Sequence, residues 1–370
     1  MKTVRRLLYA DIVSSVLFVA LAFLSLFFFI DFVDELGDVK KGYTAFHAML
    51  YTLLELPGHL YELTPIAVLI GTIYALSRLA QSSEFTILRT GGLSPGRALT
   101  LLAGLGLAFG VFTFVIGDYI TPVSENAAAH LQARFKGGFS LGNSGAWLKD
   151  HSSTSQGERS FTVNVAGASG TGELLNIRIF EFDGNGRLLR RLSAASGHVA
   201  RNDVWELSDV AIADWSAVDA AGNSVSVAET KSASYNWPSS LSAGVVAAAV
   251  LPEDSMSTLA LFRYITHLSD NEQAAQRYEI KFWKRALYPL ACLVMVGMAL
   301  PFAYLHARAG GVSYKVFGGI MLGISFVLLN NVAAHLGLLQ GWTPWIVAAT
   351  PSLIYLLLSF AAFSWLVRYR

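Results

Sequence analysis

The chain has 370 residues, of which 54% are hydrophobic and only 14% are charged, and its mean hydropathy is +0.48. A soluble globular domain is about a quarter charged, so this composition predicts a membrane protein with several spans. The formal net charge of +1 does not suggest nucleic acid as a partner, and the single Cys292 excludes an intrachain disulfide.

Six apolar stretches are long enough to cross a bilayer as helices, which takes about 20 residues each. They run from Leu7 to Ile30, Met49 to Leu76, Ala98 to Ile116, Leu287 to Leu305, Val316 to Leu339 and Trp345 to Val367. The first stretch follows basic residues, as a secretory signal would. Its apolar run is too long for a signal, however, and no cleavage motif of small residues follows it. We therefore predict a retained helix.

Basic residues in the short loops favour an N-terminus in the cytoplasm. The cytoplasmic side would then hold Lys2, Arg5, Arg6, Arg78, Arg89, Arg97, Arg308, Arg368 and Arg370. The opposite side would hold Lys40, Lys41, Lys281, Lys284 and Arg285, which conflict with the rule. Because six spans return the chain to its starting side, both basic termini are still predicted to be cytoplasmic.

Residues 120–275 are predicted to form an all-β domain outside the cytoplasm. ELLNIRIFEFDGNGRLLRRLSA (173–194) reads as two strands joined by a turn at 183–186. The runs HVARNDVWELSDVAIADW (198–215) and NSVSVAETKSASYNW (223–237) continue the alternation. Strands at this spacing are typical of an antiparallel sandwich, a jelly roll or an open barrel. After Pro252 a helical pattern capped by Ser257 leads into the fourth span.

The motifs of nucleotide binding and catalysis are incomplete. GGLSPGRALT (91–100) lacks the Lys-Ser/Thr pair of a phosphate loop. GFSLG (138–142) matches G-x-S-x-G, but it enters a β domain rather than the strand-to-helix turn of an α/β hydrolase. The eight histidines show no metal-ligand spacing. We therefore predict no catalytic residue and no metal site in this chain.

A short charged segment, RLAQSSEFTILRTGGLSPGR (78–97), separates the second and third spans. Ser82 or Ser83 can cap a short helix, Glu84 would occupy its favourable first turn, and Gly91 with Gly92 would end it. Phe85, Ile87 and Leu88 would form an apolar patch. One interpretation is an amphipathic loop lying on lipid headgroups, which composition alone favours. The other is a coupling helix that docks in a groove of a separate cytoplasmic motor.

Several segments resemble the lipopolysaccharide export permeases, the LptF/LptG family of ABC transporter subunits. They are FVDEL (32–36), MLYTLLELP (49–57), LAQSSEFTILRTGGLSPGRAL (79–99), IFEFDGNGRL (179–188), SASYNWPSSL (232–241) and RYEIKFWKRALYPL (277–290). The plan of three spans, a β insertion and three more spans extends the resemblance over the whole chain. YTLL followed by LP, together with the FEFD-turn-RL hairpin, favours the LptG type over the LptF type.

The resemblance implies a permease subunit rather than an enzyme. It would pair with an LptF-like permease to form a cavity that takes lipopolysaccharide from the outer leaflet of the inner membrane. A separate LptB-like ATPase dimer would drive export, so ATP and magnesium would bind there and this chain would need no cofactor. The β domain would be a periplasmic jelly roll continuing into an LptC-like protein and an LptA-like bridge. The implied domains are 1–119, 120–275 with flanking helical connectors, and 276–370.

The resemblance also implies sites. Glu84, Phe85, Leu88 and Arg89 lie where the family's coupling helix meets the ATPase, with Phe85 filling a pocket and Glu84 pairing with a basic residue. Phosphates of lipid A would meet basic residues at the cavity mouth, whereas the alternative is ordinary snorkelling of these side chains to headgroups. The basic set is Lys40, Lys41, Arg134, Lys136, Lys281, Lys284 and Arg285.

Two further positions bear on the resemblance. Asp31 stands where family members carry a lysine, so we expect the contact made there to shift to Lys40 and Lys41. Gly319 and Gly323 form a G-x-x-x-G motif that permits close helix approach. The resemblance places them at the subunit seam, and packing inside the subunit is the alternative. The runner-up function for the whole chain is a membrane-anchored assembly scaffold that does not transport.

Overall fold

The computed structural model confirms six helices that are long and apolar enough to span a membrane within the residues it describes. They are Val4–Leu36, Ala45–Gln81, Pro95–Phe135, Gln276–Tyr304, Val312–Gln340 and Pro344–Trp365. The structure describes residues 2–40, 42–136, 139–140, 145–154, 157–169, 173–200, 204–215, 227–239, 241, 245–246, 249, 256–271, 273–304 and 311–368.

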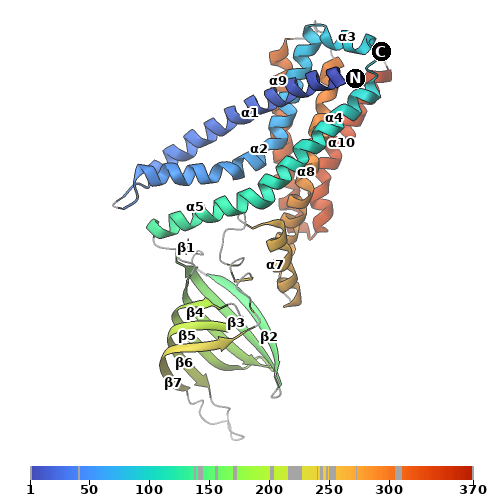
Figure 1. The fold of residues 1–370 in the computed structure, drawn as a ribbon. Coiled ribbons are helices and arrows are strands. Elements are labelled where there is room, and N and C mark those ends of the chain that lie inside the picture. Colours follow the sequence, from blue (N-terminus) through green and yellow to red (C-terminus); the bar gives the residue numbers. More distant parts are fainter. Residues whose placement is uncertain are drawn as a thin grey trace. The chain divides into compact units, whose positions relative to one another are not determined.

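The first two spans form a pair of long helices, α1 (Lys2–Leu36) and α2 (Ala45–Gln81). Helix α2 contains Pro57 and Pro65, and its direction changes along its length (Figure 1). Its last turn leads into the short helix α3 (Glu84–Thr90). Figure 1 places α3 at the same end of the helical bundle as the N-terminal turns of α1 and the C-terminus.

The third span extends well beyond the expected end at Ile116. Helix α4 (Pro95–Val115) passes into a π-helical turn η1 (Ile116–Ile120) and then into α5 (Thr121–Lys136). The segment TPVSENAAAHLQARFK is too polar to be recognised as a span, but its alanines favour helix. The helical connector predicted next to the β domain is therefore a direct continuation of the span.

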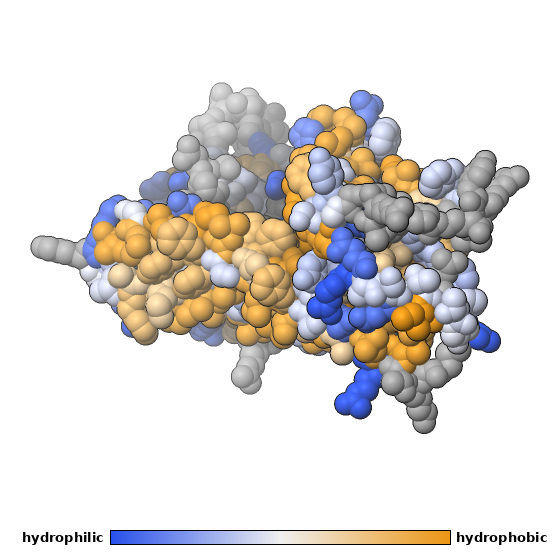
Figure 2. All heavy atoms as spheres, turned by 90° about the horizontal axis from the view of Figure 1, so that it is seen from above, coloured by the Kyte–Doolittle hydropathy of each residue, from blue (hydrophilic) through white to orange (hydrophobic). Residues whose placement is uncertain are grey.

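The last three spans are α8 (Gln276–Tyr304), α9 (Val312–Gln340) and α10 (Pro344–Arg368). Helix α8 packs against both α4 and α10, and its second half is largely buried. The apolar core gathers side chains from α1, α2, α4 and α8, including Ile12, Leu76, Leu102 and Met295. Elsewhere, apolar side chains cover much of the surface in Figure 2, as expected of helices that face lipid.

The insertion contains a seven-stranded antiparallel sheet in its described residues, which confirms the all-β class. The strands are β1 (Phe139–Ser140), β2 (Ala146–Thr154), β3 (Gly157–Ala168), β4 (Leu174–Asp183), β5 (Leu188–Val199), β6 (Val204–Trp215) and β7 (Val227–Pro238). Their order is β1-β3-β4-β5-β6-β7, with β2 also paired to β3. Strands β2 to β7 thus follow one another as a meander (Figure 1).

The predicted hairpin joins β4 and β5. The Asp183 side chain accepts hydrogen bonds from the backbone N–H groups of Asn185 at 3.0 Å and Arg187 at 2.8 Å. Gly186 supplies a left-handed φ of 77°. One face of β4 buries Ile177, Ile179 and Glu181, which alternate along the strand. The turn expected at 201–203 lies outside the described residues.

The predicted cap at Ser257 is also confirmed. Helix α7 (Thr258–Asp270) begins there, and the Ser257 hydroxyl accepts a hydrogen bond from Ala260 N–H at 3.2 Å. The helix ends at Asp270, with Asn271 as its C-cap, rather than running on into α8.

The chain divides into two compact units. The helical unit comprises Met1–Asp38, Thr52–Ser124 and Gln276–Arg370, and the sheet unit comprises Val39–Tyr51 and Glu125–Ala275. The connection between the first two spans is therefore grouped with the insertion, which its position in the sequence does not indicate.

Candidate functional site

Helix α3 lies in a tight helix–turn–helix between α2 and α4. The turn after α2 places Ser83 at φ 61°, and Ser82 N–H donates to Arg78 O at 3.0 Å. On the other side, Gly92 has φ 101° and Leu93 N–H donates to Leu88 O at 3.0 Å. Ser94 then caps α4. The expected short helix, with Glu84 in its first turn, is confirmed.

The large aromatic residue of α3 points into the bundle. Phe85 is only 3% exposed, and its ring packs edge-on against Tyr304 of α8, with ring centroids 5.2 Å apart. Leu88, one turn later, packs against the same core. In this chain Phe85 therefore anchors α3 to α8, whereas the family resemblance implied that its ring would fill a pocket of the ATPase.

The outward face of α3 carries a different apolar residue. Ile87 is 66% exposed, and Glu84 is exposed as well. The side chain of Arg89 lies outside the described residues. The apolar patch predicted from Phe85, Ile87 and Leu88 is thus divided by the helix, because Phe85 and Leu88 share the inner face while Ile87 faces away.

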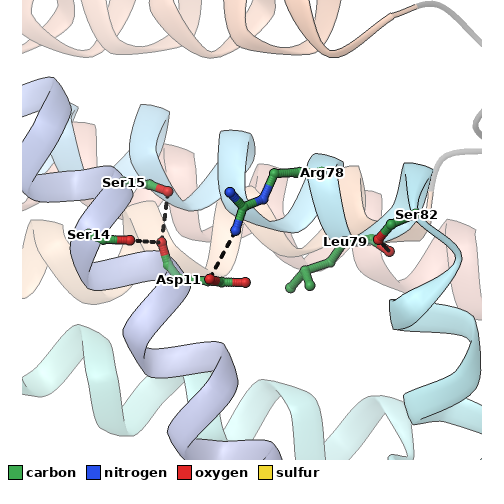
Figure 3. A network of polar contacts seen from close by, with 6 residues as sticks. All are labelled: Asp11, Ser14, Ser15, Arg78, Leu79 and Ser82. Carbon is green, nitrogen blue, oxygen red and sulfur yellow. Dashed lines mark hydrogen bonds and ion pairs between the residues drawn. The ribbon is translucent and has the colours of Figure 1, made fainter.

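Polar contacts hold the start of α1 close to α3 (Figure 3). Asp11 Oδ1 accepts from Arg78 Nη2 at 2.9 Å, and Arg78 belongs to the last turn of α2. The hydroxyls of Ser14 and Ser15 donate to the backbone oxygen of Asp11 (Figure 3). The Tyr9 hydroxyl donates to Leu101 O of α4 at 2.8 Å. The first turns of α1 are thus joined to both helices that flank α3.

Helix α1 is packed along only half of its length. Leu8, Ile12, Val16 and Ala20 are buried and repeat every four residues, so they form one stripe against the core. Among residues 21–36, all of which the structure describes, no side chain is buried. We call residues 21–36 the open half of α1.

Two of the predicted lipid-contacting residues flank one aromatic junction in the sheet unit. Lys40 is exposed and shares two backbone hydrogen bonds with Tyr43, whose ring lies 5.7 Å from that of Phe135. Arg134, the neighbour of Phe135, is exposed. Lys41 and the side chain of Lys136 lie outside the described residues. The structure therefore brings the backbone of the α1–α2 corner next to the end of α5.

The basic residues at the start of α8 are less accessible. Lys281 and Lys284 are partly buried. Arg285 Nε lies 4.0 Å from Asp118 Oδ1, and the centre of the guanidinium lies 5.6 Å from the centre of the Tyr61 ring. The guanidinium also donates a hydrogen bond to the backbone oxygen of Gly117. These partners surround the π-helical turn η1, so the charge of Arg285 is balanced inside the bundle rather than presented at a surface.

The paired glycines of α9 contact another helix of the same chain. A Cβ atom on Gly319 would lie 2.7 Å from the Ile73 side chain, and one on Gly323 would lie 2.8 Å from Ile66. Both isoleucines belong to α2. The close approach permitted by the G-x-x-x-G motif therefore serves packing inside the subunit, rather than the subunit seam that the family resemblance implied.

One side-chain cluster and one ion pair are among the contacts that the sequence did not predict. Asp31, Glu55 and His59 bring their ligand atoms within 4.8 Å of one another, although the histidines show no metal motif in the sequence. The spacing of Glu55 and His59, four residues apart, was the available signal. No local pattern in the sequence predicts the Asp11–Arg78 ion pair, because the two residues lie 67 positions apart on different helices.

Comparisons with known proteins give one family. The profile described as "Lipopolysaccharide export system permease LptF/LptG" matches residues 6–366. Lipopolysaccharide export system permease protein LptG of Escherichia coli strain K12 is 29% identical over 89% of each chain, and the protein of that name from strain CFT073 gives the same values. The LptG protein of Haemophilus influenzae is 26% identical, again over 89% of each chain.

Proposed function

The chain belongs to the lipopolysaccharide export system permease LptF/LptG family, and from this premise we propose that its α3 segment couples it to an ATPase. It is a multi-pass inner-membrane permease subunit for lipopolysaccharide export, and its curated relatives carry the LptG name. Nothing in the fold or among the relatives favours a scaffold without transport activity.

The proposed orientation puts α3 and both termini in the cytoplasm and the sheet unit in the periplasm. Basic residues near α3, such as Arg78 and Arg97, support this assignment through the positive-inside rule. The start of α1 and the end of α10 lie at the same end of the helical bundle as α3 (Figure 1). An ATPase in the cytoplasm would then meet α3 directly.

One observation carries the coupling proposal: Phe85 and Ile87 point to opposite sides of α3. Ile87 and Glu84 offer an apolar side chain and a negative charge to a partner, while Phe85 fixes α3 against Tyr304 of α8. A push on the outer face of α3 would therefore be transmitted to α8, and α8 packs on α4 and α10. The ATPase would be an LptB-like dimer that binds ATP and magnesium itself.

The experiment substitutes the outward residues and leaves the anchor intact. Ile87→Ser removes an apolar contact worth about 2 kcal/mol, so we expect about 30-fold weaker association with the ATPase. Glu84→Ala should weaken association with the ATPase further, because it leaves the basic residue that pairs with Glu84 without a counter-charge. Association is measured by co-purification in detergent and by lipopolysaccharide-stimulated ATP hydrolysis.

The matched control is Ile346→Ser, because Ile346 is also exposed but lies at the beginning of α10, away from α3. This variant should retain the ATPase at the parent level. Retention of the ATPase and unchanged hydrolysis in the Ile87→Ser, Glu84→Ala double variant would exclude α3 as the docking helix. A helix that only rests on lipid headgroups would give that result.

We further propose that lipopolysaccharide passes along the open half of α1. Phe29 and Ile30 leave an apolar surface there that suits acyl chains. Lys40, Arg134, Lys281 and Lys284 remain the proposed contacts for lipid A phosphates, and Arg285 would act by fixing η1 through Asp118. The partner permease would be LptF-like, and the sheet unit would continue into LptC-like and LptA-like proteins.

A further inference from the structure

Two helices of the bundle bring three metal-ligating side chains together at one place. Asp31 comes from α1, whereas Glu55 and His59 come from α2. One ligand atom from each of the three lies within 4.8 Å of the others, and Asp31 Oδ2 is 2.7 Å from His59 Nε2. All three residues are partly buried. This cluster takes no part in the coupling proposed above.

The local structure explains why these side chains meet. Glu55 and His59 are four residues apart, so they lie on one face of α2. Phe27 lies four residues before Asp31 on α1, and its ring stacks on the His59 imidazole with centroids 5.1 Å apart and planes 26° apart. The phenyl ring thereby fixes the orientation of the imidazole whose Nε2 faces Asp31.

The three side chains of the cluster are of types that bind cations. Two carboxylates within the long apolar helices are costly unless they are neutralised. A protonated His59 would offset one negative charge, whereas a divalent cation bound with neutral imidazole would offset both. We propose that Asp31, Glu55 and His59 form a binding site for a divalent transition-metal ion, with Zn²⁺ as the best fit, that ties the open half of α1 to α2.

The ligand set selects the metal. Zn²⁺ binds imidazole nitrogen and carboxylate oxygen, often through three protein ligands with a fourth position left for water or another ligand. Calcium takes six to eight oxygen ligands, and magnesium keeps most of its waters, so neither gains from an imidazole. Three protein ligands on two helices therefore match zinc in number and type.

The geometry requires only small side-chain movements. Zinc bonds of about 2.0–2.1 Å in a tetrahedron place neighbouring ligand atoms about 3.3 Å apart. The 2.7 Å contact between Asp31 and His59 would lengthen slightly, and the widest separation, within 4.8 Å, would shorten. Displacements of this size are within the reach of rotations about side-chain bonds.

The site would have a consequence for α1. No residue of its open half is buried, so packing constrains this segment weakly. A metal bridge at Asp31 would add a strong connection to α2 in the same segment. Zinc would therefore restrict the movement of residues 21–36, and its removal would release them.

The test uses the full chain in detergent after removal of metals with a chelator. Zinc is titrated against a fluorescent zinc indicator, and the bound metal is counted by elemental analysis. We expect one zinc ion per chain. Asp31→Asn, Glu55→Gln and His59→Gln should each weaken binding by more than about 100-fold, since changes outside the ligand set already cost about 10–100-fold.

Two control variants remove similar groups outside the cluster. Asp34 is an exposed carboxylate on the same helix as Asp31, and His335 is an exposed histidine of α9. Asp34→Asn and His335→Gln should bind zinc like the parent chain. Elution of every variant as a single species of unchanged size shows that the substitutions leave the fold intact.

Two further measurements identify the site. X-ray absorption spectra at the zinc edge should show nitrogen and oxygen ligands near about 2.0 Å and no sulfur ligand. The absence of sulfur distinguishes this site from binding at Cys292. Zinc should slow hydrogen exchange in residues 21–36 of the parent chain but not of the His59→Gln variant. Absence of stoichiometric zinc binding, or equal binding by the ligand variants and the controls, would reduce the cluster to a hydrogen-bonded pair and overturn the proposal.

Discussion

The two halves of α1 are both apolar, yet only one of them is packed. In residues 2–20, Leu8, Ile12, Val16 and Ala20 are buried against the core, while in residues 21–36 no side chain is buried. The open half contains the more aromatic sequence, LAFLSLFFFIDFVDEL. The apolar side chains of the open half therefore suit an apolar environment outside the core of this chain. In a subunit of this family, such a surface is available to lipid or to another subunit.

The two halves differ because, in a bilayer, burying an apolar side chain against another helix gains no hydrophobic free energy over leaving it in lipid. Close approach of helices decides which half is packed. Gly71 of α2 allows contact with α1, since a Cβ atom there would lie 2.6 Å from the Cα atom of Val16. In the open half, the contacts between α1 and α2 include the polar pair of Asp31 and His59 and the stacking of Phe27 on His59.

The largest effect is expected where the packed half is closest to α2. Gly71→Ala should lower the stability of the helical unit by about 3 kcal/mol, because the added methyl group meets backbone atoms of Val16 that cannot rotate away. Unfolding in a denaturing detergent, followed by helix content, measures the loss.

The control for this change is Gly96→Ala, since a Cβ atom on Gly96 would have nothing within 4 Å. Alanine there should leave stability unchanged or raise it by about 0.5 kcal/mol. Equal stability of the Gly71 variant and the parent chain would mean that the two helices are not in close contact.

A smaller effect compares the same residue type in the two halves. Ile12 is 0% exposed and Ile30 is 45% exposed. Ile12→Ala should cost about 2 kcal/mol, because it leaves a cavity among fixed neighbours. Ile30→Ala should change stability by less than about 0.5 kcal/mol. The same unfolding assay applies, and similar losses for both variants would remove the distinction between the two halves.

The smallest effect concerns the ion pair that fastens the packed half near α3. Asp11→Asn should cost at most about 1 kcal/mol, since the side chain of Arg78 is 53% exposed and solvent screens the interaction. A double-mutant cycle with Arg78→Gln isolates the pair, and its coupling energy should shrink as salt is raised. A coupling energy that is large and independent of salt would indicate a buried pair instead.

Local signals in the sequence predicted much of this fold. The apolar lengths predicted six spans, the Asp183–Gly186 turn predicted the β4–β5 hairpin, and Ser257 predicted the start of α7. Each of these features depends on residues close together in the chain. The resemblance to the LptF/LptG family, from the quoted motifs, is confirmed over residues 6–366.

The directions in which side chains point could not be predicted in the same way. Phe85 faces inward and Ile87 outward, although both are apolar residues of one short helix. The glycines of α9 contact α2, and no local pattern names that partner. Arg285 lies against Asp118, which comes from a helix far away in the sequence. Apolar residues face both lipid and protein in a membrane, so hydropathy cannot distinguish the two sides.

The most direct test asks what lies against the open half of α1 during transport. A photocrosslinking amino acid replaces Phe29, which is 65% exposed, and in a second variant Leu357 of α10, which is 68% exposed. Both variants are irradiated in growing cells. We expect crosslinks to lipopolysaccharide at position 29 that depend on an active ATPase, and crosslinks mainly to phospholipid at position 357. The same phospholipid products at both positions would contradict a lipopolysaccharide path along α1.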